Sequence, residues 1–437
     1  GVFDIFDITS KLNSLVAGQN ILAIQGLNGS LGSSDFLINP ELHAGSTSAA
    51  PPGQPPIDFG AIEFSPDSGN QDEEYIELVN SNNIAVDLSG WQISNAVRHT
   101  FRPGTVIPAG GSLFVSPDVN AFRARGTSPT SGEARFVQGA YSGHLSSFGE
   151  TVELREPDGT LNGSTAYIGA PSDAQLYLVI SEVMYHPTPD SAAEYIELLN
   201  ISDSVTLDLT GVKLTAGVSF DFTGSAVTSL APGARVLVVR DMAAFTAAQG
   251  AGLPVAGVFT ALSRLNNDGE RVKLDDALNG TIKEFTYNDV APWPVAADSG
   301  YSMVLIAPET NPDPDLASNW RSSALPGGNP NTSDAIAAPS DPDALLEHAL
   351  GSDLGTFALA PPASGSGAGP IFSYPFRLGA DGVTTRVDTS DDFITWSTAT
   401  TTLISTVPQG DGFAIVTLQL DPAGPRFFVR LVVETTP

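Results

Sequence analysis

The stretch Glu74-Tyr75-Ile76-Glu77-Leu78-Val79-Asn80 decides the fold, because it returns 120 residues later as Glu194-Tyr195-Ile196-Glu197-Leu198-Leu199-Asn200. Four further blocks return in the same order, at offsets of 120 to 123 residues. They begin at Asp87 and Asp208, Phe101 and Phe222, Asp118 and Asp241, and Gly149 and Gly269. Ordered repetition at one period indicates two copies of a single domain.

Each copy favours β-strands. Residues 75–78 alternate in character, and residues 236–239 form a short run of mostly β-branched side chains. Pro-Ala-Gly-Gly at residues 108–111 is turn chemistry, because proline presets one dihedral and glycine supplies a positive φ. Short helices are expected only at residues 120–125 and 242–249.

Length and composition predict several β-rich units. A chain of 437 residues exceeds one compact core, and 43 Gly with 33 Pro are typical of frequent turns. The expected units are terminal strands of an upstream domain at 1–42, a linker at 43–56, a first module at 57–170, a second module at 176–334, a linker at 335–343 and a C-terminal β-domain at 344–437. Because the chain opens with Gly1, we expect a processed product or a fragment.

Charge excludes some partners. Nineteen basic against 49 acidic residues give a net charge of −30, which repels nucleic acid and anionic membrane surfaces. No apolar run approaches the roughly 20 residues that span a bilayer. Self-association, other surface proteins and glycans remain as partners.

Catalytic patterns are not found in the sequence. The chain has no cysteine, no Gly-x-Ser-x-Gly elbow, no zinc-binding His-Glu-x-x-His and no phosphate-binding Gly-Lys-Ser/Thr loop. The paired carboxylates of Glu74 and Glu77 are three residues apart, so on a strand they face opposite sides and do not converge as a glycosidase pair would. We therefore expect no catalytic residues and no cofactor other than calcium.

A few side chains are candidates for binding. Calcium favours hard oxygen ligands, which the sequence offers in two acidic loops, although the same residues are ordinary turn formers. The calcium candidates are Asp67, Asp72, Glu73, Asn266, Asp268 and Glu270, with Asp313 and Asp315 as a further pair. Trp293, between two prolines, is the candidate for an exposed ligand platform, whereas Trp91 is expected to pack, since Val212 replaces it in the second copy.

The repeated pattern resembles the lamin-tail domain, an immunoglobulin-like β-sandwich. The resemblance rests on Ile180-Ser181-Glu182-Val183, Glu194-Tyr195-Ile196-Glu197-Leu198, Asp208-Leu209-Thr210-Gly211 and the closing residues 265–270. It implies tandem sandwiches in an all-β chain. The first copy departs from the pattern, with Ala61 where Glu182 stands and without the Trp-containing extension that ends the second copy.

Weaker resemblances extend to both ends. Residues 20–36 are similar to the end of a jelly-roll, galactose-binding-like domain, and the last unit is similar to C-terminal β-domains of exported planctomycete and verrucomicrobial proteins, which often carry a CotH-like kinase domain upstream. These resemblances imply a secreted or surface-anchored bacterial protein. The expected function is structural or adhesive and non-enzymatic, with an accessory tail of a larger exported enzyme, glycan-binding or spacer, as the alternative.

Overall fold

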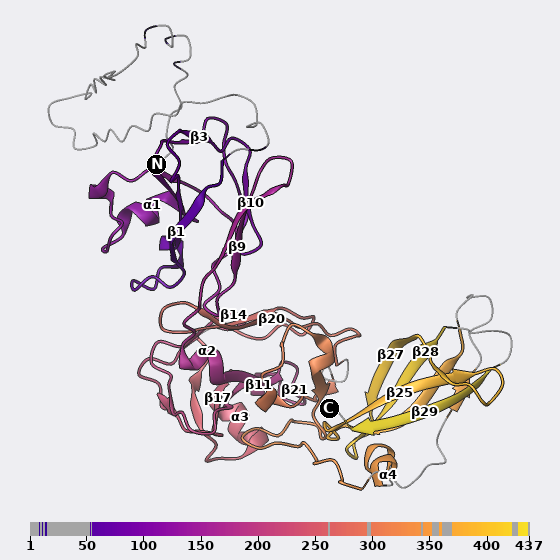
Figure 1. Ribbon diagram of the computed structural model, residues 1–437. Helices are drawn as coiled ribbons and strands as arrows, with labels where there is room; N and C mark the ends of the chain where they lie inside the picture. The colour runs from indigo at the N-terminus through magenta and orange to yellow at the C-terminus, as the bar shows by residue number, and fades with distance from the viewer. Residues whose placement is uncertain are drawn as a thin grey trace.

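A computed structural model describes residues 55–260, 263–294, 299–341, 344–351, 358–360, 369–421 and 427–435, together with Ile8, Lys11, Ser14 and Gly53. The expectations for residues 1–42 and most of the 43–56 linker therefore lie outside the described residues. Figure 1 shows three β-rich units following one another along the chain. Among the described residues, no helix has the length and apolar character needed to cross a membrane.

The first module is a sandwich of two four-stranded sheets. One sheet has the order β1-β2-β7-β8, with β1 at Asp58–Glu63, β2 at Tyr75–Val79, β7 at Ser112–Val115 and β8 at Val137–Gln138. The other has the order β10-β9-β4-β5, with β10 at Leu161–Ala166, β9 at Thr151–Arg155, β4 at Gln92–Ser94 and β5 at His99–Thr100. The small pair β3 (Val86–Asp87) and β6 (Val106–Ile107), helix α1 (Val119–Ala124) and the 3-10 turns η2 (Gln71–Glu73) and η3 (Ser131–Glu133) complete it.

The second module repeats this topology. The order β11-β12-β17-β18 corresponds to β1-β2-β7-β8, with β11 at Leu178–Met184, β12 at Tyr195–Asn200, β17 at Arg235–Val239 and β18 at Val255–Val258. The facing sheet is β15-β14-β19-β20, at Phe220–Asp221, Lys213–Ala216, Arg271–Asp275 and Thr281–Thr286. The pair β13 (Leu207–Asp208) and β16 (Ser229–Leu230), turn η4 (Ser191–Ala193) and helix α3 (Met242–Gln249) match their counterparts. The tandem β-sandwich expectation is thus confirmed.

Helix α2 (Asp173–Tyr177) was not predicted from the sequence. It starts with a capping box, in which Ser172 and Gln175 bond each other's backbone N–H groups. Gln175 also donates to the Thr281 carbonyl oxygen at 3.0 Å, so α2 belongs to the second module, just ahead of the expected start at 176.

The second module carries an extension that the first lacks. Strands β21 (Met303–Leu305) and β22 (Trp320–Ser322), with turns η6 (Pro308–Thr310) and η7 (Ala317–Asn319), add two strands beyond β11. Every residue of β11 is buried, and Glu182 and Val183 of this strand pair with β21. The corresponding β1 has no outer neighbour among the described residues, and three of its six residues are exposed.

The C-terminal domain is a third sandwich, with sheets β23-β24-β28-β27 and β26-β25-β29. Its strands are β23 (Ala358–Ala360), β24 (Ile371–Arg377), β25 (Val383–Ser390), β26 (Ser397–Thr398), β27 (Thr401–Pro408), β28 (Phe413–Leu420) and β29 (Phe428–Thr435). Helix α4 (Leu345–Leu350) buries Leu345, Ala349 and Leu350 against them, although the sequence reading expected no helix there.

Arg321 fastens the C-terminal domain to the second module. Its guanidinium lies 2.6 Å from an Asp334 carboxylate oxygen and 3.0 Å from an Asp381 oxygen, and its side chain is only 10% exposed. Arg321 belongs to β22, Asp334 precedes the linker and Asp381 lies in the C-terminal domain. The Arg321 guanidinium therefore joins three parts of the chain through its hydrogen bonds to two carboxylates.

Replacing Arg321 with alanine is expected to undock the C-terminal domain, because the carboxylates of Asp334 and Asp381, 12% and 9% exposed, lose their counter-charge. Breaking a fully buried pair typically costs about 3–5 kcal/mol, which is the upper end for these partly exposed groups. Limited proteolysis of the full chain should show faster cleavage near residues 335–343. Arg386→Ala is the matched control, since Arg386 pairs with Asp388 and Glu434 while its own side chain is 38% exposed. Equal cleavage rates in the two variants would contradict the fastening role.

Candidate functional site

The first glutamate of the repeated motif holds a loop in each module. Glu74 accepts the Leu145 backbone N–H at 3.0 Å, and Glu194 accepts the Leu265 N–H at 2.8 Å. Both carboxylates are buried, and burial raises the pKa of each. The motif glutamates are thus acceptors for backbone groups that would otherwise be buried without a partner.

Basic side chains accompany these glutamates but differ between the copies. Glu74 lies 3.5 Å from the Nδ1 of His144, and Tyr141 donates to it at 3.0 Å. Glu194 lies 2.7 Å from the Nη1 of Arg240. The hydrogen bond to Glu74 is the largest cause that raises the pKa of His144.

The closing hairpin of each module is fixed in the same way. Glu270 accepts the Asn266 N–H at 2.6 Å, and the Tyr287 hydroxyl donates to the Asn266 carbonyl oxygen at 2.7 Å. Asn266 in turn accepts the Asp268 N–H at 3.1 Å. Glu150 and Tyr167 make the matching contacts in the first module. The calcium candidates Asn266 and Glu270 therefore have turn-forming roles in the structure.

The first acidic loop is likewise a turn. Asn70 caps η2 by accepting the Asp72 N–H at 3.2 Å, and its amide lies 3.5 Å from Glu73. Asp67 lies in the preceding turn, and Asp313 accepts the Asp315 N–H at 3.0 Å elsewhere. Within the described ranges, no three His, Cys, Asp or Glu side chains are grouped so that they could hold a metal ion. The candidates are thus not brought together as a ligand cluster.

The Trp293 side chain is not fully exposed to solvent. It is half-buried and packs against the core of the second module, with its ring centroid 6.5 Å from that of Phe285. Trp320 stacks on Phe285 at 5.1 Å. Trp91 is fully buried in the first module, so its expected packing role is confirmed.

The most unusual ionisable group is Glu182 on β11. Its Oε1 accepts the Tyr195 hydroxyl at 2.7 Å, the Asn329 N–H at 3.0 Å and the Ser302 hydroxyl. Its Oε2 is buried with no hydrogen-bond partner among the described residues. Glu197 lies opposite it on β12. Burial first, and the charge of Glu197 second, raise the pKa of Glu182 to about 7.

Glu197 also contacts the extension. Its Oε1 accepts Ser181 at 2.7 Å and the Arg235 Nε at 2.9 Å, and its Oε2 accepts the Asn331 N–H at 2.5 Å. Burial is the largest cause that raises its pKa. Two facing glutamates thus bind backbone N–H groups of residues 329 and 331.

The glutamate pair is closed off from solvent. Both side chains are 1% exposed, and Gly328 covers Glu182 so closely that a Cβ there would lie 2.3 Å from Oε1 and 2.0 Å from the Tyr195 hydroxyl oxygen. A catalytic carboxyl needs a reacting group within hydrogen-bond reach. The pair therefore anchors the extension.

This role explains a sequence difference that the motif alone left unexplained. In the first module, Ala61 replaces Glu182 and no extension strand is added among the described residues. Glu77, the counterpart of Glu197, instead accepts the Ala61 N–H at 3.1 Å. The first module thus differs from the second in both the glutamate and the extension that this glutamate binds. Sequence reasoning noted the difference but missed Ser302 and Tyr195 as partners.

Comparison with known proteins identifies both modules. Residues 56–169 and 171–289 each match the family model described as Lamin Tail Domain, which together is more than half of the chain. The extension and the C-terminal domain lie outside both matches. A search of curated proteins finds no match.

Glu194→Ala should destabilise the second module by about 1–3 kcal/mol, because the Leu265 N–H is left buried without an acceptor. Chemical denaturation of the full chain measures the loss. Glu284→Ala, which removes a 40%-exposed carboxylate paired with Arg271, should change stability by less than about 1 kcal/mol. If the two variants were equally stable, the loop-holding role would be refuted.

Glu182 should make the second module less stable as pH rises. Its folded pKa of about 7 lies above its ordinary value of 4.5, so its contribution is fully present below pH 4.5 and is lost as pH rises through 7. The loss is about 3 kcal/mol, at about 1.4 kcal/mol per unit. Hydrogen exchange of β11 amides between pH 5 and pH 8 measures it, after correction for intrinsic exchange rates. Glu182→Gln should flatten the trend, whereas exposed Glu309→Gln should keep it; a flat wild-type profile would disprove this role.

Proposed function

The chain belongs to the lamin tail domain family, and from that premise we propose that it is a non-enzymatic structural protein whose tandem sandwiches space and join other proteins outside the cell. The proposal rests on the contacts that the repeated acidic residues make in the structure. Glu74, Glu194, Glu150 and Glu270 all accept backbone N–H groups. The acidic residues that recur in both modules thus hold the scaffold together, which supports a structural role.

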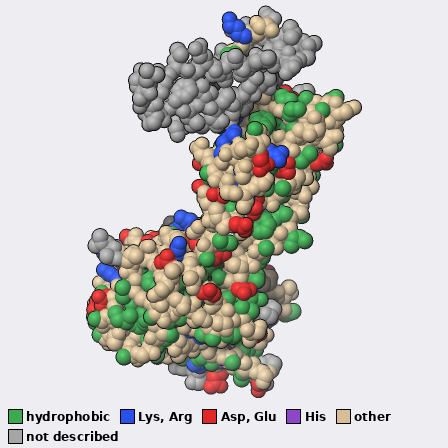
Figure 2. Space-filling view, turned by 90° about the vertical axis from the view of Figure 1, so that its left-hand side faces the viewer, with side chains coloured by type: hydrophobic (Ala, Val, Ile, Leu, Met, Phe, Trp, Pro, Cys, Tyr) green, Lys and Arg blue, Asp and Glu red, His purple; other side chains and the backbone are tan. Residues whose placement is uncertain are grey.

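Surface charge is compatible with this role. On the face seen in Figure 2, Asp and Glu side chains are scattered over both modules and do not gather in one patch. With a net charge of −30, such a surface keeps a long chain soluble and favours partners that are not acidic. An exported bacterial setting, like that of the proteins the sequence resembles, is part of this proposal.

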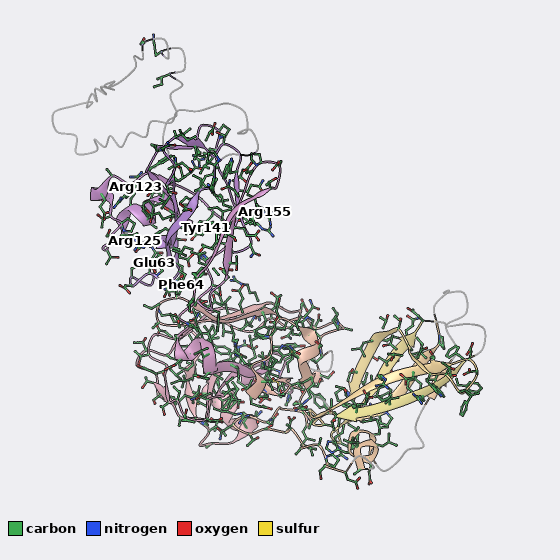
Figure 3. All side chains as sticks on the ribbon, in the orientation of Figure 1. Glu63, Phe64, Arg123, Arg125, Tyr141 and Arg155 are labelled. Carbon is green, nitrogen blue, oxygen red and sulfur yellow. The ribbon has the colours of Figure 1, made fainter. Side chains whose placement is uncertain are left out.

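The open edge of the first module supports self-association. Strand β1 lacks an outer neighbour among the described residues, whereas the same edge of the second module is occupied by β21. Unpaired edges accept strands from other chains. Glu63 at the end of β1 lies 3.8 Å from Arg125, which follows α1 and has a side chain only 2% exposed (Figure 3). This ion pair ties the end of β1 to the rest of the first module.

A second candidate function is that of an accessory tail, glycan-binding or spacer, of a larger exported enzyme. A polar cleft of about 630 Å³ between the two modules supports it. In that function the modules would hold a catalytic partner near its polymeric substrate without acting on it.

Analytical ultracentrifugation with and without millimolar calcium tests the first function. We expect concentration-dependent association, which Ala61→Lys should weaken by placing a charge on one of the three exposed residues of β1. Ala231→Lys, at an exposed turn of the second module, is the matched control. Association that appears only with calcium would implicate the acidic loops. A monomer in both conditions would contradict self-association and favour the accessory tail.

A further inference from the structure

The cleft between the two modules is built by segments from both. One wall carries residues 68–72 and the hairpin loop 144–148 of the first module, and the other carries Gln175 with residues 273–281 of the second. Its volume of about 630 Å³ is in the range of small-molecule sites. Neither module could form it alone.

Hydrogen bonds between the modules hold the cleft in shape. The Gln71 side chain donates to the Leu278 carbonyl oxygen at 3.1 Å, and Asn279 donates to the Gly69 carbonyl oxygen at 2.5 Å. Gly69 has a φ of +72°, and a Cβ there would lie 3.3 Å from the Leu278 Cα. The turns around Gly69 and Leu278 therefore contact each other at one end, and the cleft is present without a ligand.

Most of the charges that line the cleft are paired. The Lys273 ammonium lies 2.9 Å from Asp275, and His144 is paired with Glu74 beneath it. The carboxylate of Asp72 accepts no hydrogen bond from any described residue. Because the Asp72 carboxylate remains without a paired cation in the described part of the chain, the lining disfavours an anion and offers an acceptor to the hydroxyls of a neutral ligand.

One aromatic ring faces the same cleft. Phe148 is 52% exposed, and its loop is fixed by the Ser146 hydroxyl, which accepts the Phe148 N–H at 3.1 Å. Gly149 approaches the Tyr167 backbone so closely that a Cβ there would lie 2.6 Å from its oxygen. The backbone of this turn is thus fixed, and the exposed Phe148 ring offers an apolar face.

The cleft side chains are not part of the repeat. At the 120-residue offset, Phe148 corresponds to Asp268 and Asp72 to Ala192, although the scaffold residues around them are retained. The module therefore folds without an aromatic ring or a carboxylate at these positions. Their presence on the first module, at the cleft, requires another reason.

We propose that this cleft binds a short segment of a neutral oligosaccharide. Asp72 would accept hydrogen bonds from neighbouring hydroxyls, Lys273 and His144 would donate to others, and Phe148 would pack against the C–H face of one sugar ring. A carboxylate acceptor together with amide and cationic donors around a single exposed ring matches a pyranose better than a wholly apolar or an anionic ligand.

Isothermal titration calorimetry of the full chain with cellohexaose, mannohexaose and chitohexaose, and with anionic hexagalacturonate, tests the proposal. At least one neutral probe should bind, and hexagalacturonate should bind at least tenfold more weakly. Phe148→Ala and Asp72→Ala should each weaken the neutral probe at least tenfold. Phe393→Ala removes a 64%-exposed ring of the C-terminal domain and should leave binding unchanged.

Binding by none of the neutral probes would overturn the proposal, as would binding that survives both cleft variants or that is lost in Phe393→Ala. Thermal melting of each variant shows whether it is folded. The test is independent of self-association, because Ala61→Lys should keep the affinity of the wild-type chain. If that variant loses the sugar while Phe148→Ala retains it, the ligand binds at the β1 edge and the cleft assignment fails.

Discussion

One hydrogen bond supports each lamin-tail sandwich: a buried glutamate at the start of the second strand accepts the backbone N–H of a leucine before the closing hairpin. Glu74 with Leu145 and Glu194 with Leu265 make this bond. It joins the strand of one sheet to the loop that leads into the other. The hairpin glutamate and tyrosine then fix the rest of that loop, so the two sheets close around their core at the same place in both copies.

Local chemistry made most of the architecture predictable. The repeat, the turn residues and the alternation of residues 75–78 gave the sandwiches, and helices α1 and α3 appear at Val119–Ala124 and Met242–Gln249 as expected. Helix α2 was missed because only one turn of sequence encodes it, and its stability comes from Gln175 bonding to β20. Tertiary partners of this kind leave no periodic signal in the chain.

The polar residues were harder to interpret than the apolar ones. Asp, Asn and Glu in loops suggested calcium, but in the structure Asn266 and Glu270 bond to backbone groups. The glutamate pair of the second module was visible only as a contrast with Ala61, since its partners Ser302 and Asn329 come from 120 and 147 residues away in sequence. Spacing alone could not bring them together.

Arg321 also determines how the chain would carry mechanical load. Asp334 and Asp381 bind the same guanidinium from opposite sides of the linker. A pulling force on the two ends loads the contact between Arg321 and Asp381, which must break before the C-terminal domain can separate from β22. The linker adds a second resistance, because the Ile336 N–H donates to the Gly379 carbonyl oxygen at 2.6 Å. A protein that spans two anchored bodies would then respond stiffly to small displacements and compliantly to large ones.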